Sequence, residues 1–327
     1  MREGAMKILV TGTGVIGTTY AWQLALSGNT LVHFVRPGKK RALVERGIRV
    51  RCLDQRCGRN AERETVYQPA IVDDFGPGDG YDLIICSVNS HQLAELLPLL
   101  ADRAGDTTIL FLQNMRPGDD ELIDRYLDQS RYVIGYPFKA GGGRDESGID
   151  TVIFGNYLSN TVLGERNGRI TPRLKVLHRL LAGADMNPKM IRKIVPYIRT
   201  HYIWAAASLG AYMKAGSWER FIGPEITRES CLAMREGWKI CERQGIKPRR
   251  VAPTCYYYLP LPLMVPLIGF MYRDGGMRRM FEGHVGHSPE EMRTMYYDVL
   301  GLGETYGIDM PYYRGFKRFV DGYFSRQ

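Results

Sequence analysis

The sequence predicts an α/β fold: an N-terminal Rossmann-type, doubly wound sheet followed by a C-terminal all-helical domain. Three observations lead to this prediction. Short apolar runs alternate with helix-like segments as far as Glu165, which is typical of a parallel sheet covered by helices. A glycine-rich turn joins the first apolar run to the first helical segment. Beyond Asn167 the strand-like runs give way to longer segments with helical spacing.

The predicted strands of the first domain are short and continuously apolar, as expected for strands buried on both faces. They are Lys7–Thr11, Thr30–Val35, Tyr81–Val88, Thr108–Leu112 and Arg131–Tyr136, with Thr151–Asn156 and Thr161–Gly164 as closing strands. Helices are expected at Val15–Ser27, which Gly28 ends, and at Gln92–Leu100. Gly141–Gly143 is predicted to begin a flexible stretch.

The second domain is predicted to be helical because its apolar residues recur at helical spacing. The expected helices are Thr171–Gly183, Ile194–Lys214, Ile226–Gly245 and Pro289–Tyr306. Leu259–Phe270 is strongly apolar, but it contains three prolines and is shorter than a bilayer span. We expect a buried wall or a subunit interface there, which makes a homodimer conceivable. The change of pattern divides the chain into residues 1–166, a dinucleotide-binding domain, and residues 167–327, a substrate or dimerisation domain.

The chain of 327 residues carries 44 lysines and arginines against 35 acidic residues, a formal net charge of +9. The basic residues are spread along the sequence without an RNA-binding or helix-turn-helix signature. This favours an anionic small molecule over nucleic acid as the partner. None of the six cysteines forms a CxxC pair, and the N-terminus runs into a strand without a signal peptide. A cytoplasmic protein with reduced thiols is therefore expected.

Two histidines, His284 and His287, lie close to Glu282 and Glu290 in the segment FEGHVGHSPEEM. The spacing matches no metal-binding motif, and glycine and proline interrupt it. We therefore expect no metal site, and interpret the segment as a polar loop that caps the next helix at Ser288.

The glycine-rich turn is the strongest functional signal. Gly12, Gly14 and Gly17 spell G-T-G-V-I-G directly after a predicted strand and at the start of a predicted helix. In a dinucleotide-binding fold these glycines allow a tight turn, close approach of the backbone to a pyrophosphate, and packing of helix on strand. The helix N-terminus then stabilises the negative charge. The predicted cofactor-binding residues are Gly12, Thr13, Gly14, Val15, Ile16 and Gly17.

The end of the second predicted strand indicates which cofactor is used. An NAD-binding site usually has an acidic residue there, which binds the ribose hydroxyls. This chain has Arg36, and no acidic residue lies between Gly28 and Glu45. A guanidinium suits a 2′-phosphate by charge and by bidentate geometry. The prediction is NADP(H), with a solvated basic loop as the alternative.

Several segments together resemble the ketopantoate reductase (2-dehydropantoate 2-reductase) family. That family reduces 2-dehydropantoate with NADPH and combines a Rossmann domain with a helical domain. The resemblance is specific in the first half of the chain and loose in the second. The matching segments are KILVTGTGVIGTTYAWQLALSGNTLVHFVR, Ser87–Gln92 (SVNSHQ), Ile109–Leu122 (ILFLQNMRPGDDEL), Thr161–Glu165 (TVLGE) and Gly303–Tyr313 (GETYGIDMPYY).

The match implies roles for two residues at predicted strand ends. Gln92 corresponds to the glutamine of the family's V-K-x-x-Q segment, although the lysine is Asn89 here. Asn114 corresponds to the asparagine of its L-Q-N-G segment, although the glycine is Met115. Strand ends of an open α/β sheet face the ligand crevice, so both are predicted to contact cofactor or substrate, with plain turn residues as the alternative.

The second half departs from the family pattern. The segment IRTHYIWAAASLG places His201 at the position of the family's catalytic lysine, and Ala205 and Leu209 at its two asparagine positions. Thr294–Asp298 (TMYYD) corresponds to S-S-M-x-x-D, whereas the following acidic stretch has no counterpart in this alignment. His201 is the predicted general acid, since its ordinary pKa of ~6.5 suits proton donation. A packed helical histidine is the alternative.

These observations predict an NADPH-dependent reductase of a 2-oxo acid or related carbonyl. The lost polar positions, together with the apolar segment and Tyr256–Tyr258, favour a larger or more apolar substrate than ketopantoate. An opine-type or hydroxy-acid dehydrogenase of the same architecture is one alternative. A dinucleotide-binding sensor that retains the glycine turn without catalysis is the other.

Overall fold

The computed structural model describes residues 4–58, 60–156, 158–287 and 289–325. By contacts the chain forms two compact units. We call Met1–Ile194 with Arg279–His287 the N-terminal unit, and Val195–Arg278 with Ser288–Gln327 the helical unit. The functional division between residues 1–166 and 167–327 stays a prediction.

The N-terminal unit is built on an eight-stranded main sheet with the order β12-β11-β8-β7-β6-β1-β2-β5. Every neighbouring pair is parallel except β11 and β8, which are antiparallel. The strands are β1 (Lys7–Thr11), β2 (Thr30–Phe34), β5 (Ala70–Val72), β6 (Leu83–Cys86), β7 (Thr108–Leu112), β8 (Tyr132–Pro137), β11 (Thr161–Gly164) and β12 (Pro188–Met190). The predicted Rossmann-type sheet is confirmed, because five of these strands lie within or overlap the apolar runs at residues 7–11, 30–35, 81–88, 108–112 and 131–136.

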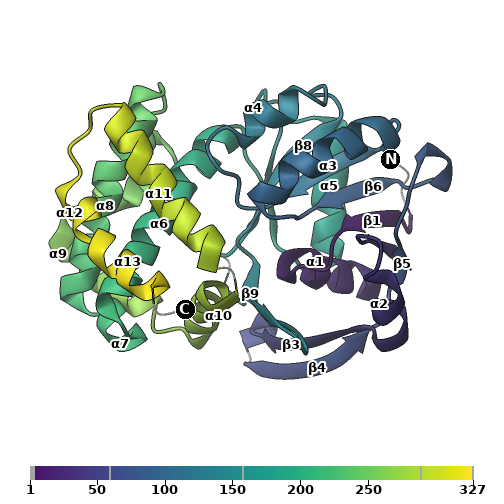
Figure 1. The fold of residues 1–327 in the computed structure, drawn as a ribbon, viewed down its shortest axis with the longest axis horizontal. Coiled ribbons are helices and arrows are strands. Elements are labelled where there is room, and N and C mark those ends of the chain that lie inside the picture. The colour runs from purple at the N-terminus through teal and green to yellow at the C-terminus, as the bar shows by residue number, and fades with distance from the viewer. Residues whose placement is uncertain (1–3, 59, 157, 288, 326–327) are drawn as a thin grey trace. The chain divides into compact units, whose positions relative to one another are not determined.

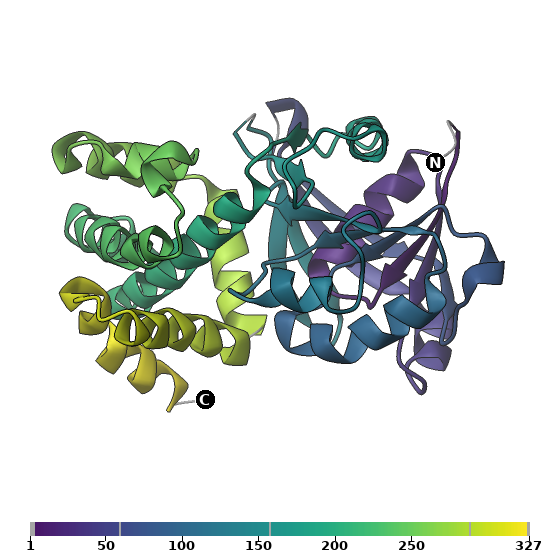
Figure 2. The ribbon, with the colours of Figure 1, turned by 90° about the horizontal axis from the view of Figure 1, so that it is seen from above.

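Helices cover both faces of the main sheet, as the apolar character of its strands requires. The helices of this part are α1 (Val15–Leu26), α2 (Lys40–Arg46), α3 (Ser90–Arg103), α4 (Asp119–Asp124) and α5 (Pro172–Gly183). Figure 2 shows α3 and α4 on one face and α1 with α5 on the other. The core between α1 and the sheet contains fully buried Ile8, Val10, Tyr20 and Leu24.

A second sheet, with the order β4-β3-β10-β9, lies on the side of α1 away from the main sheet (Figure 1). Its strands are β3 (Ile48–Asp54), β4 (Ala61–Tyr67), β9 (Ala140–Asp145) and β10 (Gly148–Ile153). The sequence pattern did not predict this sheet. The strand expected at Thr151–Asn156 belongs here, as part of β10, instead of closing the main sheet.

The glycines of β9 correct a second expectation. Gly141–Gly143 was predicted to begin a flexible stretch, but it pairs with β10 along its whole length. A Cβ atom on Gly141 would lie 2.4 Å from Cγ of Met280, and one on Gly143 would lie 2.5 Å from the carbonyl oxygen of Gly283. The glycines are therefore required because helix α10 (Gly275–His287) packs directly on the strand.

The helical unit contains the long helices predicted from the spacing. Its helices are α6 (Ile194–Ala215), α7 (Trp218–Phe221), α8 (Pro224–Arg243), α9 (Leu261–Met271), α11 (Pro289–Thr305), α12 (Pro311–Gly315) and α13 (Lys317–Phe324). The amphipathic α8 buries Trp238, whose indole N–H donates to the carbonyl oxygen of Thr200 on α6 at 2.9 Å. This bond fixes the packing of the two longest helices.

Two expectations for the second half need correction. His284 and His287 lie on α10 and not in a polar loop; the predicted cap at Ser288 falls outside the described residues. The apolar segment Leu259–Phe270 is mostly α9, and its outer face is no buried wall, because Leu263 is 64% and Phe270 70% exposed. Within residues 4–58, 60–156, 158–287 and 289–325, no helix is long and apolar enough to cross a membrane.

Candidate functional site

The glycine turn follows β1 and leads into α1, as predicted. Gly12 has φ +80°, a left-handed conformation that favours glycine, and its N–H donates to the carbonyl oxygen of Phe34 at 2.8 Å. Gly14 precedes the helix, and a Cβ placed on it would meet no atom within 4 Å. A Cβ on Gly17 would lie 2.3 Å from Oγ of Ser87 and 3.1 Å from Cγ1 of Val10, so this glycine allows α1 to pack closely.

These features fit a dinucleotide pyrophosphate. The first N–H groups of an α-helix have no partner within the helix, and the helix dipole favours an anion there. The first turn of α1 contains no acidic residue, and the first hydrogen bond within the helix runs from the N–H of Thr18 to the carbonyl oxygen of Gly14 at 2.9 Å. The space beside Gly14 leaves room for a phosphate to approach the backbone.

The order of the strands places this turn at the ligand-binding edge. β1 lies between β2 and β6, and the chain moves from β1 to β2 on one side before it returns to β6 on the other. In open α/β sheets, ligands bind beyond the carboxyl ends of the strands at such a reversal. The ends of β1, β2, β6 and β7 at Thr11, Phe34, Cys86 and Leu112 therefore share one edge.

Arg36 follows β2 at this edge, where the sequence analysis expected the 2′-phosphate contact. Its side chain is 65% exposed, and its Nη2 forms an ion pair with Oε2 of Glu95 on α3 at 3.3 Å. Glu95 is 76% exposed, so the pair is weak and can exchange for a phosphate. The neighbouring Lys40 forms an ion pair with Asp73 at 2.8 Å, which leaves Arg36 as the more suitable candidate.

Hydrogen bonds connect the start of α3 to the loop after β7. Oγ of Ser90 donates to the carbonyl oxygen of Asn114 at 3.3 Å and to Oδ2 of Asp119 at 2.7 Å. The N–H of Gln92 donates to the carbonyl oxygen of Asn89 at 2.9 Å in the first turn of α3. The structure thus brings Gln92 and Asn114 to neighbouring segments of the edge that carries the glycine turn, and their contacts with a ligand stay a prediction.

His201, the predicted general acid, lies on α6 among aromatic rings. Its ring stacks on Tyr197, with centroids 6.1 Å apart, and lies 5.0 Å from the ring of Trp204. Trp204 donates from Nε1 to the hydroxyl of Tyr257 at 2.9 Å. Burial lowers the pKa of His201 to about 3, so the imidazole is neutral at neutral pH. This environment disfavours proton donation by an imidazolium.

Glu291 on α11 is a titratable group that the sequence analysis did not select. Burial raises the pKa of its carboxyl group to about 7, so a large part of it is protonated at neutral pH. A carboxylic acid in this range is suited to general acid catalysis. No sequence signal distinguishes it, because Glu291 lies in an ordinary acidic helix start and the shift of its pKa depends on surroundings that the fold supplies.

Asp298, which the alignment placed in the family's S-S-M-x-x-D segment, has a different setting. Its Oδ2 accepts a hydrogen bond from the hydroxyl of Tyr202 on α6 at 2.7 Å. Tyr202 is 2% exposed, so the contact ties α11 to α6 within the core of the helical unit. Asp298 therefore has a structural partner.

Comparison with known proteins agrees with these features. The sequence model of the family described as "Ketopantoate reductase PanE/ApbA" matches residues 8–166. The matched segment contains the glycine turn, Arg36, Gln92 and Asn114. No match was found among curated proteins.

Solved structures match over nearly the whole chain. The 2-dehydropantoate 2-reductase from Geobacter metallireducens GS-15 has a TM-score of 0.73 and 17% identity, with 97% of this chain and 99% of that chain covered. The 2-dehydropantoate 2-reductase from Methylococcus capsulatus has a TM-score of 0.68 and 18% identity, with 98% of this chain and 97% of that chain covered. D-mandelate dehydrogenase, in a ternary structure with NADH and anilino(oxo)acetate, has a TM-score of 0.70 and 17% identity, with 97% of each chain covered. At such low identity, the likeness establishes the fold.

Proposed function

We propose that the protein is a divergent member of the ketopantoate reductase family, whose sequence model matches residues 8–166, and that it is an NADPH-dependent oxidoreductase that reduces a 2-oxo acid or a related carbonyl. The observation that carries the proposal is the geometry of the turn Gly12–Gly17. It combines a left-handed Gly12, open space beside Gly14 and a helix N-terminus without acidic residues. The cofactor, when bound, supplies the hydride that reduces the carbonyl carbon.

The chain's own residues hold the cofactor and complete the proton transfer. The turn from Gly12 to Gly17 binds the pyrophosphate, and Arg36 binds the 2′-phosphate after release from Glu95. Gln92 and Asn114 contact the cofactor or the substrate from the first turn of α3 and from the loop after β7. The reaction adds one hydride to the carbonyl carbon and one proton to its oxygen, which gives a 2-hydroxy acid and NADP⁺.

Two titratable side chains of the helical unit, His201 and Glu291, are candidates for the proton donor. His201 was selected from the sequence, and the pKa of about 3 means that it is not protonated at neutral pH. Glu291, whose pKa burial raises to about 7, is a second candidate, because a partly protonated carboxyl group can donate a proton near neutral pH. In that case His201 has a packing role between Tyr197 and Trp204.

A larger, aromatic 2-oxo acid is the favoured substrate class. The helical unit surrounds His201 with aromatic side chains, and Tyr256 exposes 57% of its surface. Among the structural relatives, D-mandelate dehydrogenase was crystallised with an aryl 2-oxo acid amide, anilino(oxo)acetate. A hydroxy-acid dehydrogenase of this type is the second candidate function, and it shares the same reaction in reverse.

A spectrophotometric screen tests the proposal. NADPH oxidation is followed with a panel that contains ketopantoate, small aliphatic 2-oxo acids and aryl 2-oxo acids. We expect an aryl or bulky aliphatic member to exceed ketopantoate in kcat/KM. A value for ketopantoate of ~10⁴ M⁻¹s⁻¹ or above would show that ketopantoate is the substrate. Absence of oxidation with every member would favour a dinucleotide-binding sensor.

The proposal includes a homodimer formed through α9. Leu263, Leu267 and Phe270 lie on one face of this helix at spacings of four and three residues, and they are 64%, 48% and 70% exposed. Burial of such a stripe against a second copy removes apolar area from water. Light scattering of the purified chain and of Leu263→Glu measures the state: the proposal expects a dimer that the substitution dissociates.

The cellular setting in the proposal is the cytoplasm. Cys52, Cys86, Cys231 and Cys241 are buried free thiols, and Cys255 is a free thiol of intermediate exposure. Free thiols are the usual state of cysteine in a reducing compartment.

A further inference from the structure

An arginine outside the glycine turn contacts it directly. Arg144 lies on β9 of the second sheet, and its Nη1 donates to the carbonyl oxygen of Thr13 at 3.0 Å and to Oγ1 of Thr13 at 3.2 Å. The two residues are separated by 131 positions in the sequence. Thr13 is only 7% exposed, so the contact is largely shielded from water. Hydrogen bonds from a charged donor are worth more than neutral ones in such a setting.

A second side chain binds the preceding carbonyl group. Nδ1 of His33 on β2 lies 2.7 Å from the carbonyl oxygen of Gly12. Burial lowers the pKa of His33 to about 4, so the ring is neutral at neutral pH and Nδ1 carries the proton that it donates. Two consecutive carbonyl groups of the turn, those of Gly12 and Thr13, are therefore held by side chains from outside it.

These contacts determine where the turn's N–H groups point. The C=O and N–H of a trans peptide unit point in opposite directions. When His33 holds the carbonyl of Gly12, the N–H of Thr13 is directed away from β2. When Arg144 holds the carbonyl of Thr13, the N–H of Gly14 is directed away from β9. A pre-oriented pair of donors binds an anion without the entropic cost of ordering the turn.

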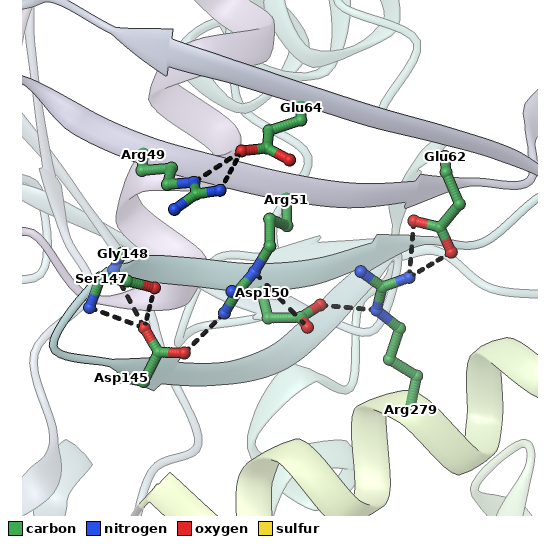
Figure 3. Close-up of polar contacts among 9 residues, drawn as sticks. All are labelled: Arg49, Arg51, Glu62, Glu64, Asp145, Ser147, Gly148, Asp150 and Arg279. Carbon is green, nitrogen blue, oxygen red and sulfur yellow. Dashed lines mark hydrogen bonds and ion pairs between the residues drawn. The ribbon is translucent and has the colours of Figure 1, made fainter.

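The strand that carries Arg144 is held in place on its outer face. Oδ2 of Asp145, the next residue, accepts from Nη2 of Arg51 at 2.6 Å, and its Oδ1 accepts from the backbone N–H of Ser147 at 2.8 Å (Figure 3). On the adjacent β10, Asp150 accepts from Nε of Arg279 of α10 at 2.5 Å. The alternation of a strand directs Asp145 to this outer face and Arg144 to the opposite one.

We infer that Arg144 is a positioning residue for the cofactor's pyrophosphate: it fixes the Thr13 peptide of the glycine turn and places a positive charge beside it. This inference rests on the proposed function, because it concerns the same cofactor. It adds a residue of the second sheet to a site otherwise built from the main sheet. The second sheet thereby acquires a role in cofactor affinity as well as in covering α1.

The test compares two ligands on variants of the full chain. NADPH is titrated by calorimetry, and adenosine 2′-monophosphate, which lacks the pyrophosphate, by ligand-observed NMR. We expect Arg144→Met to weaken NADPH binding about tenfold or more and to change the affinity for adenosine 2′-monophosphate less than about twofold. Arg144→Lys keeps a charged donor and should recover part of the NADPH affinity. Arg36→Met should weaken both ligands.

Arg49→Met is the matched control, because it removes the same charge from the second sheet, where Arg49 forms an ion pair with Glu64. It should leave both affinities unchanged. Equal loss of both ligands in Arg144→Met, or unchanged NADPH affinity in that variant, would overturn the inference while the proposed function stands. If the unmutated chain binds no NADPH, the proposed function fails and this inference fails with it.

Discussion

We expect Gly17→Ala in the glycine turn to lower the free energy of unfolding, because the new methyl group would contact two side chains. The added Cβ would lie 2.3 Å from Oγ of Ser87 and 3.1 Å from Cγ1 of Val10. The first contact is about 1 Å inside ordinary van der Waals separation, and such overpacking costs about 1–3 kcal/mol of folding free energy. Helix propensity favours alanine over glycine by about 1 kcal/mol. We therefore expect a net loss of up to about 2 kcal/mol.

Ser87→Ala should remove the destabilisation caused by Gly17→Ala. Oγ of Ser87 is buried and has no hydrogen-bond partner within the part of the chain that the structure describes, so its removal alone should be neutral or slightly stabilising. In the Ser87→Ala background, only ordinary contacts and the Val10 methyl oppose the new Cβ, and Gly17→Ala should cost little or stabilise. The coupling in this double-mutant cycle should be about 1–2 kcal/mol.

Urea denaturation followed by circular dichroism measures all four chains. Gly301→Ala serves as the control, because Gly301 lies inside α11 and a Cβ there meets no atom within 4 Å, so it should be stabilising. A Gly17→Ala loss that persists unchanged in the Ser87→Ala background would refute the reasoning, since the clash with Oγ would then not be its cause.

The remaining predictions concern charges and pH. Glu95→Gln should raise NADPH affinity up to about fivefold in a fluorescence titration, because it frees Arg36 from its ion pair; Arg36→Asp should remove the preference over NADH. His201→Phe should keep turnover within about threefold, because the neutral ring acts in packing, and a loss of ~10²-fold or more would restore its role as acid. Turnover should fall as pH rises through about 7 and become pH-independent there in Glu291→Gln; an unaltered profile would exclude this residue. Because the pKa of Glu291 is higher in the folded chain than its unfolded value of ~4.3, its contribution to the free energy of unfolding is present below pH ~4.3 and is lost as pH rises through about 7. Thermal melts of Glu291→Gln should show a smaller decline of stability over this range.

The main sheet could be predicted because its strands are recognisable by local pattern alone. β1, β6 and β7 each contain an uninterrupted apolar run and end next to turn or helix signals, and the glycine turn directly follows β1. Burial on both faces favours apolar residues over polar ones along such a strand. Such a strand can therefore be recognised from its own residues, without knowledge of the strands with which it pairs.

The second sheet could not be predicted in this way because its pairing is non-local. β3 pairs with β10, about 100 residues later, and its outward residues Arg49 and Arg51 are charged. The run Gly141–Gly143 has the composition of a loop, and only the close approach of α10 explains it as a strand. Arg144 was missed for the same reason, because its partner Thr13 lies 131 residues away.

In the candidate site, too, some residues could be predicted from local sequence and others could not. The residues predicted to bind a cofactor follow from a contiguous motif, whereas the candidate proton donors depend on their surroundings in the fold. Nothing in the sequence indicates the lowered pKa of His201 or the raised pKa of Glu291, because both shifts arise from neighbours supplied by the fold. Titratable groups of this kind require a structure before a role can be assigned.

The most direct test of the central claim is the fate of the transferred hydride. The chain is incubated with NADPH that carries deuterium at both hydrogen positions of C4 of the nicotinamide and with the best 2-oxo acid of the panel, and the product is analysed by mass spectrometry. We expect a 2-hydroxy acid with deuterium at C2, formed in step with NADP⁺, and less of this product from Arg36→Asp at the same subsaturating NADPH concentration. A chain that binds NADPH tightly and yields no deuterated hydroxy acid from any member of the panel would contradict it.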